Sequence, residues 1–160
     1  MNLKVNLTIA GQALNGYLNI DPLANPKDED KIATDISNID SFVDHNSAEL
    51  LLALDVLDFF PLQVRQSVLI NYMCKIAHGG SLIVGGLDIR EIGRALFYQN
   101  LDLRREANLH LFGPCDHVMR SKKSLITMDD TVEMIMNPGQ FEIQSKKFDG
   151  MHYLVEAKRN

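Results

Sequence analysis

The sequence has few of the features that define several large protein classes. Cys74 and Cys115 are its only cysteines and do not form a CxxC pair, so we expect thiols in a reducing cytoplasm instead of a disulfide framework. No stretch approaches the roughly 18 consecutive apolar residues that a membrane-spanning helix needs. The N-terminus has one lysine and a strand-like pattern, which does not read as a secretory signal. These absences predict a cytoplasmic protein with no membrane segment.

Basic charge is also scarce. The net charge is −5, and no run of lysine and arginine is longer than two residues. Sequence-independent binding to nucleic acid depends on neutralising phosphates, so we expect no nucleic-acid partner. The phosphate-binding signatures GxxxxGK and GxGxxG do not occur.

What remains is the composition of an ordinary globular protein, with 46% hydrophobic and 23% charged residues. A length of 160 residues is enough for one domain with a substantial core. We see no internal repeat, and we therefore expect a single domain over residues 1–160.

Short apolar runs alternate with helical patterns along most of the chain, which indicates an α/β sheet. Helices are expected after Pro61, Asp88 and Thr127, and also over Leu103–Leu111; the first should close at His78, and Asp88 should form a capping box with Glu91. The strands that we expect are Lys4–Ala10, Tyr17–Ile20, Lys31–Asp35, Glu49–Leu54 and Ser81–Gly86.

The C-terminal region carries a strong hairpin signal. Asp149-Gly150 separates two β-prone runs, Phe141–Phe148 and Met151–Ala157. The whole pattern predicts a doubly wound, mostly parallel, Rossmann-like α/β sheet that ends in an antiparallel hairpin.

The most informative stretch lies near the N-terminus. An apolar run is broken at Gly11, the chain breaks again at Gly16, and a second apolar run leads to Asp21. In doubly wound folds a carboxylate at the end of the second strand binds the ribose hydroxyls of an adenosine cofactor. Two further predicted strands also end on acids, Asp35 and Asp55. Aspartate is common at strand ends in any α/β protein because it favours caps and turns, so a purely structural role stays open for all three.

The segment Gly16–Asp21, GYLNID, resembles the first motif of class I S-adenosylmethionine-dependent methyltransferases. It looks most like the small subgroup whose first two strands are joined by a brief Gly-x-x-Asn-x-Asp loop. Leu54–Phe60 resembles a second family segment, and His78–Leu82 resembles the Pro-Gly-Gly-x-Leu turn of the family. The resemblance extends from about Leu3 to Lys158.

This resemblance implies a Rossmann-like methyltransferase fold and S-adenosylmethionine as the cofactor. Asp21 would bind the ribose hydroxyls and Asp35 the adenine amino group. The remaining cofactor-binding residues that it implies are Ala10 and Gly11 in the first turn, Ile36 against the adenine ring, and Leu54 near the methionine end, where Asp55 also lies. An alanine in the first turn costs about 1 kcal/mol or more if its φ is positive.

The chain departs from the family in the second segment. Asp55 and Phe59 stand where the family has histidines, and Asp58 stands at its glutamate. We retain Asp55 as a catalytic candidate, and His117 in the later loop as a second one, because a histidine can act as a general base near neutral pH. His117 could equally be an ordinary surface histidine.

The same loop groups His110, Cys115, Asp116 and His117. A structural zinc site normally uses two close pairs of ligands, and only one such group is present, so we expect no metal site.

The first functional hypothesis is methyl transfer to a small-molecule or glycan-type acceptor. A non-catalytic relative that serves as a binding or assembly module is the alternative, and its mark would be a first turn closed by Gln12 or Leu14. A different nucleotide-binding α/β protein is a third possibility. The oligomeric state cannot be read from the sequence.

Overall fold

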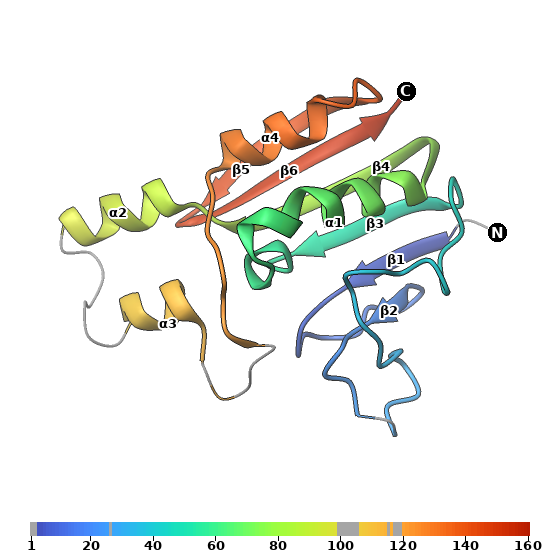
Figure 1. Ribbon diagram of the computed structural model, residues 1–160, viewed down its shortest axis with the longest axis horizontal. Helices are drawn as coiled ribbons and strands as arrows, with labels where there is room; N and C mark the ends of the chain where they lie inside the picture. The colour runs from blue at the N-terminus through green and yellow to red at the C-terminus, as the bar shows by residue number, and fades with distance from the viewer. Residues whose placement is uncertain (1–2, 26, 99–105, 115, 117–119) are drawn as a thin grey trace.

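The computed structural model describes residues 3–25, 27–98, 106–114, 116 and 120–160. Its strands form one six-stranded sheet in the order β2-β1-β3-β4-β6-β5. Neighbours among β1, β2, β3 and β4 pair in parallel, whereas β6 runs antiparallel to both β4 and β5 (Figure 1). The strands are β1 (Leu3–Leu7), β2 (Leu18–Ile20), β3 (Ala48–Leu54), β4 (Ile76–Leu87), β5 (Phe141–Asp149) and β6 (His152–Arg159).

The predicted third strand is much shorter than expected. Of Lys31–Asp35, only Ile32 pairs with the sheet, through an isolated parallel bridge to Ile20. The chain then turns away because Asp35 accepts a hydrogen bond from the backbone N–H of Ser37 (2.8 Å), which closes a local turn.

The helices are α1 (Leu62–Lys75), α2 (Ile89–Phe97), α3 (Glu106–Phe112) and α4 (Met128–Met136), with a short 3-10 turn η1 (Leu57–Phe59). Pro61 precedes α1 as predicted, but the expected end at His78 is wrong. The helix stops at Lys75 because Ile76 adopts an extended conformation and pairs with Ala48, so β4 starts five residues before the predicted Ser81. A helix was also expected over Leu103–Leu111. Residues 103–105 lie outside the described ranges, and α3 covers the remainder of this stretch.

The first turn of α2 differs from the prediction in its partners. Asp88 caps the backbone N–H groups of Arg90 and Glu91, but its second carboxylate oxygen accepts the N–H of Met128 (2.8 Å), at the start of α4. Glu91 pairs with Arg94 instead of completing a capping box. One carboxylate therefore fixes the starts of two helices relative to each other.

The two faces of the sheet are unequal. α1 and α4 contact each other and cover one face (Figure 1). The residues that point to this face are buried, among them Val5, Leu7, Leu51, Ala53, Leu82, Val84, Val155 and Ala157. On the opposite face, the register aligns Asn6, Leu52, Ile83 and Glu156 in one row.

A loop instead of a helix covers the β1 and β2 part of that opposite face. The side chains of Asn6 and Asn19 are hydrogen-bonded to each other (2.9 Å). Asn6 also donates to the carbonyl of Gln12 (3.3 Å), and the N–H of Leu14 donates to Asn19 (2.8 Å). No helix in the described part of the chain is long and apolar enough to cross a bilayer.

Candidate functional site

The functional candidates lie beyond the carboxyl ends of the parallel strands, which all meet at one edge of the sheet. Ala10 and Gly11 follow β1, Asp21 follows β2, and Asp55 follows β3. The structure brings Ala10 and Asp21 together, since the N–H of Ala10 donates to Asp21 Oδ1 (3.1 Å).

Asp21 is fully buried and well supplied with donors. Its Oδ1 accepts the N–H groups of Ala10 and Leu23 (2.9 Å for the latter), and Lys31 Nζ lies 3.3 Å from Oδ2. The same ammonium also donates to the carbonyl of Gly11. A carboxylate has about four acceptor positions, and three are used here. Lys31 therefore bridges the carboxylate and the first turn.

The first turn is strained at one residue. Ala10 has a φ of +54°, which costs an L-residue about 1–2 kcal/mol. Gly11 is required for a different reason: a Cβ there would lie 1.8 Å from Thr8 Oγ1. Gly11 therefore lets the backbone of the turn pack against the side chain of Thr8.

Asp35 and Ile36 lie on the loop that replaces the third strand. The exposed Asp35 also accepts the hydroxyl of Ser37 (2.7 Å). Ile36 is fully buried, and its carbonyl accepts the hydroxyl of Tyr72 (2.6 Å). Burial raises the pKa of Tyr72, and the charge of Asp35 adds to that rise. The predicted contacts of Asp35 and Ile36 with an adenine group stay predictions.

Leu54 and Asp55 occupy the end of β3. The side chain of Leu54 is 43% exposed. Asp55 has a φ of +55°, a conformation that aspartate tolerates better than most residues, and its N–H donates to the carbonyl of Gly85 (2.9 Å). Its carboxylate lies 3.1 Å from Nδ1 of His152. Both side chains line a cavity of about 300 Å³.

His152 was not predicted from the sequence. It is the first residue of β6 and pairs with Leu87, the last residue of β4, because β6 runs antiparallel. The Asp149-Gly150 turn was the available signal, since the residue that follows such a turn returns to the carboxyl end of a parallel neighbour. Its partner Asp55 lies 97 positions earlier in the chain.

The two side chains shift each other's ionisation. The hydrogen bond to Asp55 raises the pKa of His152 above its ordinary value. Burial would raise the pKa of Asp55, but the hydrogen bond and the charge of His152 outweigh it, so this pKa lies below the usual range. Lys122 also favours the ionised form of Asp55. The pair is therefore strongest as an imidazolium and a carboxylate.

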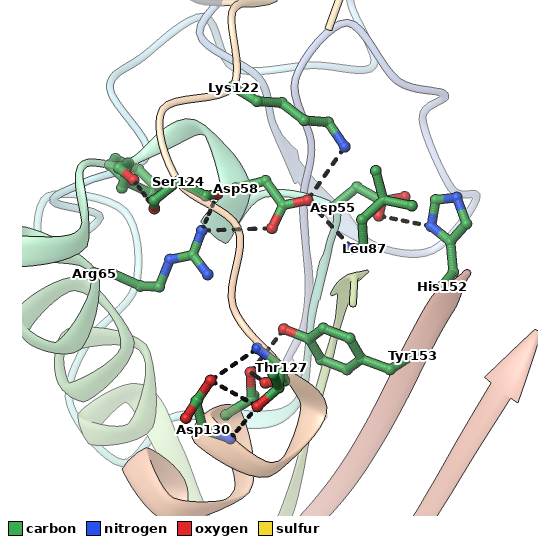
Figure 2. A network of polar contacts seen from close by, with 12 residues as sticks. Asp55, Asp58, Arg65, Leu87, Lys122, Ser124, Thr127, Asp130, His152 and Tyr153 are labelled. Carbon is green, nitrogen blue, oxygen red and sulfur yellow. Dashed lines mark hydrogen bonds and ion pairs between the residues drawn. The ribbon is translucent and has the colours of Figure 1, made fainter. Parts of the chain in front are cut away.

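A buried charge cluster lies next to this pair, and Figure 2 shows both. Asp58 is 1% exposed; its Oδ2 lies 3.3 Å from both Lys122 Nζ and the N–H of Leu87, and its Oδ1 lies 3.5 Å from Arg65. Arg65 also donates to the carbonyl of Ser124 (2.6 Å). Burial raises the pKa of Asp58 in spite of the two neighbouring cations. The cluster ties the segment around residues 122–124 to η1 and α1.

His117, the other catalytic candidate, lies outside the described residues, as does Cys115. Within the ranges that the structure describes, no group of three or more histidine, cysteine, aspartate or glutamate side chains is placed to hold a metal ion.

Comparison with solved structures identifies the fold. A methyltransferase from Methanosarcina mazei described as S-adenosylmethionine-dependent is 10% identical with a TM-score of 0.62, and the alignment covers 99% of this chain and 93% of that one. A 1,6-didemethyltoxoflavin-N1-methyltransferase from Burkholderia thailandensis, solved with S-adenosylhomocysteine, is 14% identical with a TM-score of 0.59 over 99% and 72% of the two chains.

An O-methyltransferase family protein from Burkholderia thailandensis matches with a TM-score of 0.57 and 14% identity; 81% of this chain spans 35% of that protein. No family model and no curated protein matches the sequence. The sheet and its structural neighbours establish the fold: this chain has the Rossmann-like fold of S-adenosylmethionine-dependent methyltransferases, as the sequence resemblance predicted.

Proposed function

We propose that this protein binds S-adenosylmethionine and transfers its methyl group to a small-molecule acceptor. The observation that carries the proposal is the buried carboxylate of Asp21 at the end of β2, on a fold shared with methyltransferases. A carboxylate in this place is suited to the two hydroxyls of a ribose.

The residues present fit such a nucleoside. Lys31 donates to Asp21 Oδ2 and to the Gly11 carbonyl, and ribose hydroxyls are donors that can take the same two acceptors. The hydroxyls would replace the ammonium. A hollow of about 520 Å³, which Lys31 itself lines, gives the displaced side chain room. Asp21 would then hold the ribose while Lys31 swings aside.

Other residues would hold the rest of the cofactor. The turn at Ala10 and Gly11 would face its carboxypropyl end, and Leu54 would lie near its methionine end. Asp35 would accept a hydrogen bond from the adenine amino group, with Ile36 beside the ring. The bound cofactor would supply a methyl group on an already activated sulfonium, so the protein mainly has to orient the acceptor and exclude water.

The expected mark of a non-catalytic relative concerns Gln12 and Leu14. Backbone groups of both residues are bound to side chains in the sheet face, Gln12 to Asn6 and Leu14 to Asn19. The group that lies on the Asp21 carboxylate is Lys31, a side chain that can move. This arrangement supports a site that opens on binding.

Isothermal titration with S-adenosylhomocysteine tests the proposal. We expect the wild type to bind, Asp21→Asn to bind at least tenfold more weakly, and Lys31→Met to bind about tenfold more tightly, since a hydrogen bond to a charged group contributes about 1.5–3 kcal/mol. Lys27→Met, which removes an exposed lysine from the same loop, is the matched control and should bind as the wild type does. A folded wild type that gives no heat at millimolar ligand would reject the proposal in favour of a non-catalytic module.

A further inference from the structure

We propose that the cavity beside Asp55 and His152 is the acceptor site, that it takes a small hydroxylated aromatic compound, and that His152 Nε2 accepts the hydroxyl proton. This inference rests on the proposed function for the methyl-transfer step. It names the substrate class and a proton acceptor that the sequence pattern did not indicate.

The cavity is built by the backbone as well as by side chains. It measures about 300 Å³, a size suited to a compound of one or two rings. Gly85 lies in the interior of β4, and a Cβ at this position would lie 2.8 Å from the carbonyl oxygen of Tyr153 and 3.1 Å from Leu54. Glycine within a strand often marks a place where a ligand or another backbone comes close. A larger residue here would collide with the backbone of Tyr153 and displace these cavity walls.

The walls of the cavity favour a ligand with an aromatic ring. Leu54 and Leu154 contribute aliphatic surface, and Phe148 at the end of β5 is 47% exposed, although it lines the cavity. An exposed aromatic side chain beside an apolar hollow can stack against a ring of the ligand. An apolar cavity with few polar groups at one end is the usual form of a small-molecule site.

The polar end of the cavity is formed by Asp55 and His152. Asp55 meets Nδ1 of His152 (3.1 Å), so the neutral imidazole carries its proton on Nδ1 and presents Nε2 as the acceptor. Asp55 is a positioning residue, held in place by its left-handed backbone and by its hydrogen bond to Gly85. A strained residue held by its surroundings is common at functional sites.

The charged groups around His152 are mixed in sign. Asp55 and Asp58 favour its protonated form, whereas Lys122 opposes it. His110 is near enough that His152 lowers its pKa, after the larger effects of burial and Lys122. Lys147 and Asp149 line the cavity from the β5 side. Lys122 and Lys147 would stabilise the oxyanion that forms as a hydroxyl loses its proton.

The proton and charge balance of the step is simple. The acceptor oxygen gains the methyl group and loses its proton, and this proton passes to Nε2 of His152. The imidazolium that results is stabilised by Asp55 and later releases the proton to water. No oxidant or reductant is needed, because the methyl donor is the co-reactant and S-adenosylhomocysteine is the product.

The test uses 4-nitrophenol, a one-ring phenol whose yellow phenolate form reports its ionisation. We would titrate it into the protein while following the imidazole signals of His152 by NMR and the absorbance of the phenolate. We expect saturable shifts of the His152 signals and a raised fraction of bound phenolate. His152→Gln should return the phenolate fraction to that of free 4-nitrophenol, and Asp55→Asn should lower the pKa of His152, because its hydrogen bond to Asp55 raises that pKa. Both side chains are about half exposed, so both variants should fold.

His78→Gln is the control, since His78 is an exposed histidine at the opposite end of β4 that contacts the Asn160 carbonyl. It should leave binding and ionisation unchanged. Absence of any effect of 4-nitrophenol on His152 would overturn the inference, even if S-adenosylhomocysteine binds. Binding of the phenol without binding of S-adenosylhomocysteine would uphold the cavity as a ligand site and reject methyl transfer.

Discussion

Removing the negative charge of Asp58 should destabilise the protein strongly. Asp58 is buried between Arg65, which is fully buried, and Lys122, which is 10% exposed. Two nitrogens of Arg65, Nε and Nη1, have no hydrogen-bond partner among the described residues, so its charge is compensated mainly by Asp58. The variant Asp58→Asn keeps the shape of the side chain but leaves a buried guanidinium without a counter-charge.

Breaking a buried ion pair from one side costs about 3–5 kcal/mol. The asparagine can still accept one hydrogen bond, so we expect a loss of about 3 kcal/mol in the free energy of unfolding. For a chain of this length that corresponds to a fall of about 6–12 °C in Tm. Urea titrations followed by circular dichroism would measure the change.

Two further variants separate the loss of this buried ion pair from the loss of an exposed one. Asp129→Asn breaks the ion pair with Arg90. The side chains of Arg90 and Asp129 are 57% and 64% exposed, so the loss in the free energy of unfolding should be less than about 1 kcal/mol. The double variant Asp58→Asn/Arg65→Met removes both buried charges and should be more stable than Asp58→Asn alone. If Asp58→Asn is as stable as Asp129→Asn, then the hydrogen bond to the Ser124 carbonyl is enough to hold the buried charge of Arg65. In that case Asp58 is not the group that compensates this charge.

Three other perturbations have defined outcomes. Thr127→Ala removes the capping box that Thr127 and Asp130 form at the start of α4, and should cost about 1 kcal/mol in a urea titration; no loss would mean that packing alone holds the helix. Gly11→Ala should destabilise the first turn, and Thr8→Ala in the same chain should recover part of the loss in Tm, because the clash is with Thr8 Oγ1; an unrelieved loss would place the strain elsewhere. The stability difference between wild type and His152→Gln should be small and pH-dependent, since both partners are about half exposed. The raised pKa of His152 makes its contribution full below about pH 6.5 and lost as pH rises through the folded value, and the lowered pKa of Asp55 makes its contribution full above about pH 3.9. A difference that grows above pH 7 would contradict the pairing.

The parts of the fold that the sequence predicted are those set by local chemistry. Pro61 precedes α1, Asp149-Gly150 forms the hairpin turn, and Asp21 follows β2, each because a single residue type favours that geometry. The end of α1 was mispredicted for a non-local reason. The apolar spacing through Ile76 suits a helix, but pairing with Ala48 draws this residue into the sheet.

The candidate site was less predictable than the fold. Ala10, Gly11 and Asp21 come from one short stretch, and a motif could group them. His152 meets Asp55 across 97 positions, through an antiparallel register that no local pattern specifies. Lys31 begins the stretch that the sequence predicted as a third strand, and its contact with Asp21 depends on how Ile32 returns to pair with Ile20.

The missing helix between β1 and β2 changes how the site compensates its charge. A helix that begins after the first strand would place its N-terminal N–H groups and dipole at the cofactor end of the sheet. Here no helix follows β1, and Asp21 relies on the N–H groups of Ala10 and Leu23 and on the ammonium of Lys31. Two of these three donors belong to the backbone and are fixed, whereas the third belongs to a flexible side chain. Binding of a nucleoside should therefore be governed by the displacement of Lys31, so that affinity and the stability of the free protein change in opposite directions when Lys31 is replaced.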